Sequence, residues 1–87
     1  MKLVLCPHCH DVFKLAKNVR FCACKKSGGQ YKEDGLNAVY WGGIPLGFAN
    51  STLVDAVENQ PEEGAGREFV AFVIPKKCPT MKVLGEA

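Results

Sequence analysis

Apolar residues fall in short runs along this chain, and the spacing within each run indicates an element. The first run, Lys2–Leu5, predicts a short strand. Residues 11–16 and 19–22 predict two further strands, and Lys17-Asn18 between them suits a two-residue hairpin turn because asparagine tolerates positive φ. We therefore expect an antiparallel hairpin near the N-terminus.

The middle of the chain alternates between polar and apolar segments. Residues 25–35 are polar and rich in glycine, which predicts a loop with at most a brief strand around Tyr31. Residues 36–41 contain a valine and two aromatic residues, which favour a strand that ends at Gly42-Gly43. The next segment, Ile44–Phe48, contains a proline and a glycine, so we expect an irregular connection there. The two-residue period predicts two faces for the strand, one with Leu36, Ala38 and Tyr40 and the other with Asn37, Val39 and Trp41.

One short helix is predicted after this connection. Residues 50–52 are all good N-cap residues, Asp55 would lie in the first turn, and Pro61 stops the helix after Gln60. The spacing of its apolar residues predicts a face packed on the sheet. That face would consist of Leu53, Val54 and Val57.

The most apolar segment is residues 69–74, which lacks polar alternation. This pattern predicts a strand covered on both faces, at the centre of the sheet. Pro75 and Pro79 then lead into a C-terminal tail, which we expect to be partly ordered.

Length and composition fit one folded domain. The chain has 87 residues, with 47% hydrophobic and 23% charged residues, which is an ordinary globular balance. No run reaches the ~18 apolar residues that a membrane-spanning helix needs. The first residues are too short an apolar stretch for a secretory signal, so we expect a cytoplasmic protein that does not contact a membrane.

Four of the five cysteines form two close pairs that suit a metal. Cys6 and Cys9 are separated by two residues, and Cys22 and Cys24 by one. In a reducing compartment such pairs favour metal ligation over disulfides, and four thiolates suit tetrahedral zinc. The fifth cysteine, Cys78, is then a spare thiol. We predict one structural Zn²⁺ held by the two pairs.

Other chemistry is less well supported by the pattern. Cys6-Pro7-His8-Cys9 also resembles the motif of thiol-disulfide oxidoreductases, but there a helix follows, whereas a strand is predicted here. His8 and His10 flank Cys9 and are expected to be solvated surface residues. Four thiolates leave zinc no open position for water, and no catalytic grouping is apparent, so we expect no enzyme activity.

Several residues are candidates for ligand or partner binding. The formal net charge of +2 suggests nucleic acid, but four thiolates with one divalent cation offset it. The loop after the second cysteine pair could stack a nucleotide-like ligand on its tyrosine and bind the phosphate with its lysines. The start of the helix could hold an anion. An exposed aromatic residue could anchor a partner protein. The candidates are Lys25, Lys26, Ser27, Gly28, Gly29, Tyr31, Trp41, Asn50, Ser51 and Thr52.

Part of the chain resembles small uncharacterised zinc-ribbon proteins of phage and prophage. The resemblance lies in Cys22–Tyr31, in residues 34–37 and in residues 46–51. The resemblance implies a compact, non-enzymatic accessory protein that engages a host partner protein in the host cytoplasm. Alternatives are a trap for a nucleotide-like phosphate compound and a nucleic-acid-binding zinc ribbon, and a homo-oligomer is possible.

The predicted fold is a single α+β domain. Residues 1–35 form the zinc ribbon with its β-hairpin knuckles, residues 36–77 continue into a small antiparallel sheet with one short helix, and residues 78–87 are a tail.

Overall fold

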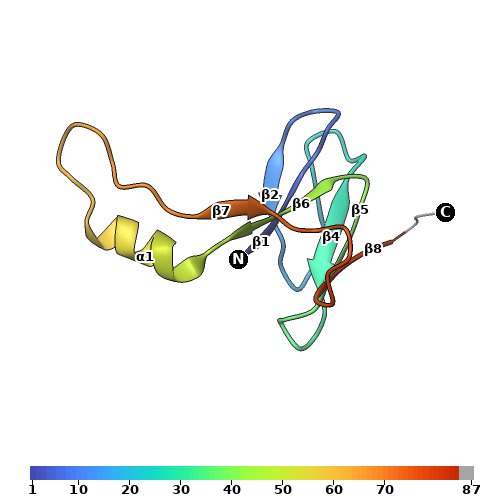
Figure 1. Ribbon diagram of the computed structural model, residues 1–87. Coiled ribbons are helices and arrows are strands. Elements are labelled where there is room, and N and C mark those ends of the chain that lie inside the picture. The colour runs from blue at the N-terminus through green and yellow to red at the C-terminus, as the bar shows by residue number, and fades with distance from the viewer. Residues whose placement is uncertain (85–87) are drawn as a thin grey trace.

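The computed structural model describes residues 1–84, which form two four-stranded sheets and one helix on a projecting arm (Figure 1). The α+β class is therefore confirmed. No helix within these residues is both long and apolar enough to cross a membrane. The elements are β1 (Lys2–Leu5), β2 (Val12–Lys14), β3 (Arg20–Phe21), β4 (Gly28–Tyr31), β5 (Ala38–Trp41), β6 (Ile44–Phe48), α1 (Asn50–Glu58), β7 (Ala71–Val73) and β8 (Met81–Val83).

The N-terminal strands that carry the cysteine turns belong to two different sheets. The first sheet has the order β2-β1-β6-β7 and is antiparallel throughout. The second has the order β3-β4-β5-β8, antiparallel except for the parallel pair β5 and β8. The predicted hairpin between residues 11–16 and 19–22 is wrong, because β2 pairs with β1 and β3 pairs with β4. Lys17-Asn18 lies in the crossing from one sheet to the other.

The hydrophobic core lies between the sheets. Val4 of β1 and Ile74, which directly follows β7, come from the first sheet, and Ala38 and Tyr40 of β5 come from the second. Leu15 fills the space where the chain crosses between them. Of the two faces predicted for the strand at 36–41, the one with Ala38 and Tyr40 lies in the core, while Leu36, which precedes β5, is 61% exposed.

The segment expected to be irregular, Ile44–Phe48, is instead β6, a central strand between β1 and β7. Its proline is tolerated because Pro45 lies at the end of the β6–β7 ladder, where its carbonyl accepts the Ile74 N–H at 2.9 Å. Its glycine has a steric role, since a Cβ at Gly47 would lie 2.6 Å from the Phe72 ring. Proline and glycine break a strand only where no neighbour accommodates them, and here Ile74 and Phe72 do so.

The most apolar segment, residues 69–74, lies at an edge rather than at the centre of a sheet. Ala71, Phe72 and Val73 are all exposed, and only Ile74 at the end of the segment is buried. The prediction of a strand covered on both faces is wrong because β6 takes the central position. This leaves an unusually apolar edge strand.

The helix is present, but its predicted environment is wrong. None of its residues is buried, and Figure 1 shows it projecting away from both sheets. The N-cap residue is Ala49, with no side-chain cap, and Asp55 lies beyond the first turn, where it pairs with Arg67 at 2.9 Å. Val54 and Val57 of the expected buried face are 53% and 63% exposed.

The remaining segments agree in part with expectation. The strand β1 is confirmed at its predicted bounds. The expected loop at 25–35 contains β4, which extends the brief strand predicted around Tyr31, and the C-terminal tail contributes β8. The last three residues of that tail, 85–87, lie outside the described residues.

Candidate metal centre

The structure brings together the four cysteines that the spacing predicts, and it draws them from both sheets. Cys6 and Cys9 lie in the turn between β1 and β2, in the first sheet, whereas Cys22 and Cys24 lie in the turn between β3 and β4, in the second. A metal ion bound here would link the two sheets at one end of the core.

The sulfur positions suit one tetrahedral ion. All four Sγ atoms lie within 4.8 Å of one another. The Sγ of Cys24 lies 3.6 Å from that of Cys6 and 3.5 Å from that of Cys22. Four sulfurs about 2.3 Å from a tetrahedral zinc would be about 3.8 Å apart. No two cysteines in the described chain form a disulfide, so all four thiols can serve as ligands.

Each cysteine pair sits in a tight turn with the same backbone feature. The His10 N–H donates to the Cys6 carbonyl at 2.9 Å, and the Lys25 N–H donates to the Cys22 carbonyl at 3.1 Å. His10 and Lys25, which follow the second cysteine of each pair, have φ angles of 61° and 65°. Left-handed backbone at non-glycine residues is uncommon, and these two turns hold it because they fold around the sulfur atoms.

Two side chains outside the cysteines hold the turns in place. Asp11 follows the first turn, and its Oδ2 accepts the Ala23 N–H of the second turn at 2.9 Å. Ser27 is fully buried, and its N–H donates to Cys22 Sγ at 3.3 Å while its hydroxyl donates to the Gly42 carbonyl at 2.8 Å. Sequence reasoning missed Asp11, because nothing in the spacing shows which N–H its carboxylate meets.

Electrostatics within the cluster favour a bound cation. Burial raises the pKa of the Cys6 thiol, but hydrogen bonds from Ser27 and from the Cys9 and His8 backbone outweigh it and lower the pKa to about 5. The Lys26 backbone N–H lowers the pKa of Cys24, yet burial and the neighbouring thiols prevail and raise it to about 12. The cluster therefore ionises in steps, and a divalent cation that displaces the remaining protons would stabilise all four thiolates.

No family model, curated protein or solved structure matches this chain. What the site can do is therefore argued from its own geometry. Four cysteines lie close enough to hold a metal ion, and sulfur ligands in this arrangement are those of zinc or iron sites.

The other residues singled out near the cysteines lie outside the cluster. His8 and His10 are both exposed. Cys78 is half-buried and packs against the core, with its Sγ 3.6 Å from the Thr80 hydroxyl. Neither histidine nor Cys78 belongs to the group that could hold a metal.

The predicted ligand-binding loop is mostly structural. Lys25 and Lys26 are exposed, but Ser27, Gly28 and Gly29 are buried. A Cβ at Gly28 would lie 2.4 Å from the Trp41 ring, and one at Gly29 would lie 2.8 Å from Leu15. These glycines make room for neighbouring side chains, and they form the start of β4, where the sequence predicts a loop. Ligand binding by these residues stays a prediction.

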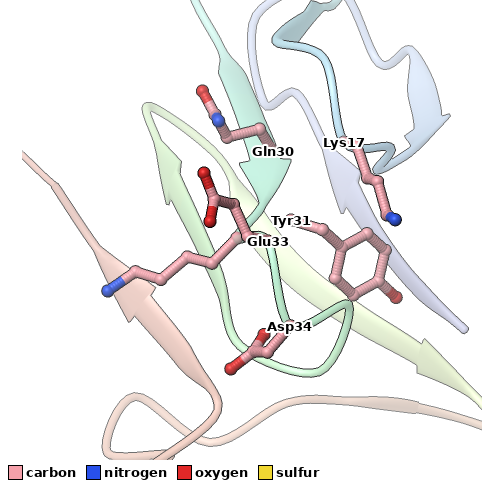
Figure 2. A pocket seen from close by; sticks show the side chains of 6 residues that line it. Lys17, Gln30, Tyr31, Glu33 and Asp34 are labelled. Carbon is pink, nitrogen blue, oxygen red and sulfur yellow. The ribbon is translucent and has the colours of Figure 1, made fainter.

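Tyr31 lies between two open hollows. Its hydroxyl accepts the Lys2 N–H at 3.1 Å, and the Lys2 ammonium lies 5.6 Å from its ring centroid. One hollow, of about 730 Å³, is drawn in Figure 2, where the labelled side chains around it do not converge on one point. The other, of about 440 Å³, is lined by Tyr31 and Asn50 together. Lys25 and Lys26 line neither hollow, whereas Lys32 lines the first together with Tyr31.

The remaining candidates are engaged in contacts within the fold. Trp41 is half-buried and packs edge-on against Phe21, with ring centroids 6.0 Å apart. Asn50 Oδ1 accepts a hydrogen bond from the Met1 nitrogen at 2.9 Å. Thr52 donates to the Ala49 carbonyl and accepts the Val70 N–H, while Ser51 is exposed.

Replacement of Ser27 by alanine should weaken the metal centre without abolishing it. The variant removes the hydrogen bond from the buried Ser27 hydroxyl to the Gly42 carbonyl, which costs about 1 kcal/mol of unfolding free energy. Because the Ser27 side chain also lowers the pKa of the Cys6 thiol, metal affinity should fall by roughly tenfold. Urea unfolding and competition with a chromogenic chelator measure both effects. Ser51→Ala is the matched control on the exposed helix, and equal results for the two variants would contradict this role for Ser27.

Proposed function

We propose that this protein is a zinc-stabilised binding module without catalytic activity, and that its zinc is structural. The observation that carries the proposal is the set of four thiols contributed in pairs by the two sheets. Zinc prefers tetrahedral sulfur ligation, and the separations of about 3.5 Å between neighbouring sulfurs suit it.

The absence of catalysis in this proposal follows from the ligand set. Four thiolates fill the coordination sphere of zinc and leave no position for an activated water molecule. The cluster also carries a net negative charge when loaded, which does not favour activation of a nucleophile. We therefore assign the metal a stabilising role, as in other small domains.

The partner in this proposal is a protein, and the surface offered to it is the arm formed by α1 and the segment before β7. A helix of nine residues with no buried side chain gains little from packing within the fold. Its exposed Val54 and Val57 therefore remain available for another apolar surface. Val57 also lines a shallow hollow of about 280 Å³, together with Leu53, Pro61 and Phe69 among others. By its resemblance to phage-type proteins, we further propose a host protein as the partner and the host cytoplasm as the place of binding.

Replacing Val57 with lysine tests this surface. Val57 is 63% exposed, so the unfolding free energy should change by no more than about 0.5 kcal/mol. A partner that co-purifies with tagged wild-type protein should be lost, because a charge then lies at the centre of the apolar surface. The measurement is affinity purification followed by mass spectrometry.

Val19→Lys is the matched control, since Val19 is 45% exposed in the crossing between the two sheets. It should retain the partner. Retention of the same partner by Val57→Lys would exclude the arm as the binding surface. If no protein co-purifies and nucleotides raise the melting temperature instead, the protein-binding proposal is wrong and a ligand trap replaces it.

A further inference from the structure

The edge strand β7 is only three residues long, but it carries none of the charged side chains or prolines that usually protect a sheet edge. Residues 69–74 contain no charged residue and no proline, and Val70, Phe72 and Val73 are about half exposed or more. Within residues 1–84, β7 pairs only with β6. Natural edge strands normally carry lysines, prolines or bulges that prevent pairing with another chain. An edge without them is suited to such pairing.

The hydrogen bonds to β6 show which backbone groups of β7 point outward. The Ile74 N–H donates to the Pro45 carbonyl, and the Val70 carbonyl accepts the Ala49 N–H, both at 2.9 Å. In an antiparallel ladder, successive residues direct their backbone groups to opposite neighbours. The backbone groups of Ala71 and Val73 therefore face the open edge.

We propose that the open edge of β7 pairs, antiparallel, with β7 of a second copy of this chain, giving a two-fold symmetric dimer. Ala71 of each copy would exchange backbone hydrogen bonds with Val73 of the other. Phe72 then lies directly opposite Phe72 of the second copy. Aromatic residues opposite one another at a non-hydrogen-bonded position form favourable cross-strand pairs.

Charges at the two ends of the segment select a second copy over an unrelated strand. Glu68 precedes the apolar residues and Lys76 follows them. The register centred on Phe72 brings Glu68 of each copy beside Lys76 of the other, twice per dimer. Neither residue forms an ion pair within the described part of the protomer. A segment with an acidic start, an apolar middle and a basic end complements its own reversed copy.

The dimer would join the first sheets of the two copies into one continuous sheet and leave both α1 arms exposed. It rests on the edge of β7 alone and does not depend on the partner protein proposed above. It would make any binding by the arms bivalent, which raises avidity without new contacts.

Mass measurement in solution tests the proposal. Size-exclusion chromatography with light scattering on the metal-containing protein should give twice the chain mass of 9.5 kDa, falling toward 9.5 kDa on dilution. Val73→Pro should be monomeric under the same conditions, because it removes an outward N–H donor while leaving the bonds to β6 in place. A wild-type mass of 9.5 kDa at the highest soluble concentration would overturn the proposal.

Charge exchange tests the register. Glu68→Lys and Lys76→Glu should each raise the dimer dissociation constant by about tenfold, because both symmetric contacts become repulsive. The double variant Glu68→Lys/Lys76→Glu should restore the wild-type value. Val57→Lys is the control and should dimerise normally, so loss of partner binding and loss of dimerisation are separable. A dimer that none of the charge variants weakens would exclude this register.

Amide hydrogen exchange tests the same edge in the wild-type protein, so its result does not depend on whether a variant misfolds. In the wild-type protein, the N–H groups of Ala71 and Val73 should become protected as concentration rises, while that of Val57 should not change. Exchange of Ala71 and Val73 that is independent of concentration would contradict pairing at this edge.

Discussion

Chelating the metal is expected to unfold the whole protein, because the metal links the two sheets at a point where the core is small. Two of the nine buried hydrophobic residues within 1–84 are the cluster cysteines Cys6 and Cys22. Zinc binding contributes about 10–16 kcal/mol in small zinc-dependent domains. A domain of this size has a total stability of about 5–15 kcal/mol. Without the ion, the remaining core cannot keep the sheets together.

Circular dichroism and Trp41 fluorescence during titration with a strong chelator measure this effect. Trp41 reports on β4 and β5 because it packs over Gly28. Elemental analysis before chelation should give one zinc ion per chain, and added zinc should restore the signal. Cys22→Ser should reproduce the loss, whereas Cys78→Ser, outside the cluster, should retain one zinc ion per chain. A metal-free protein that stays fully folded in chelator would contradict the structural role.

The cysteine cluster could be predicted from sequence because its signal is local. Two cysteines separated by one or two residues can reach one ion from a single turn, whatever the rest of the chain does. Which sheet each turn belongs to is not local information. The predicted hairpin at Lys17-Asn18 used an acceptable turn sequence, but β2 and β3 each found a better partner on the far side of a cysteine pair.

The sequence predicts a central position for the segment of β7 and none for that of β6, which is the reverse of the structure, for a related reason. Hydrophobicity predicts burial only when the partner surface is known, and the composition of residues 69–74 does not show which strand lies beside them. Pro45 and Gly47 made β6 look irregular, yet each meets a specific neighbour, Ile74 or Phe72, that accommodates it. If the open edge of β7 pairs with a second copy, some of the apolar residues at 69–74 become buried between two chains instead of within one.

The helix was found from its capping residues, but not for the reason expected. Thr52 bonds backward to Ala49 and across to Val70, so the cap-like residues tie the arm to the start of β7. Asp55 pairs with Arg67 across the same arm. Local propensity predicts where the helix lies in the sequence. The contacts between segments determine where the arm lies in space, and propensity carries no information about them.

Replacing Gly42 with alanine is the second change expected to have a large effect. Gly42 has a φ of 71°, and a Cβ there would lie 2.2 Å from the Lys26 carbonyl oxygen. Left-handed backbone costs an alanine about 1–2 kcal/mol. The clash with backbone adds about 1–3 kcal/mol, since no side chain can rotate away. The variant should therefore lose about 2–5 kcal/mol of unfolding free energy, along with the hydrogen bond from Ser27 to the Gly42 carbonyl.

Gly35→Ala separates the two contributions, because Gly35 has a φ of 70° and no atom within 4 Å of the added Cβ. It should lose only the backbone contribution of about 1 kcal/mol, measured by urea unfolding of the metal-containing protein. The difference between the two variants then measures how tightly the turn after β5 packs against the second cysteine turn. Because Ser27 joins these turns, Gly42→Ala should also weaken metal binding, whereas Gly35→Ala should not. Equal losses in stability and metal affinity for both glycines would mean that this junction does not support the metal centre.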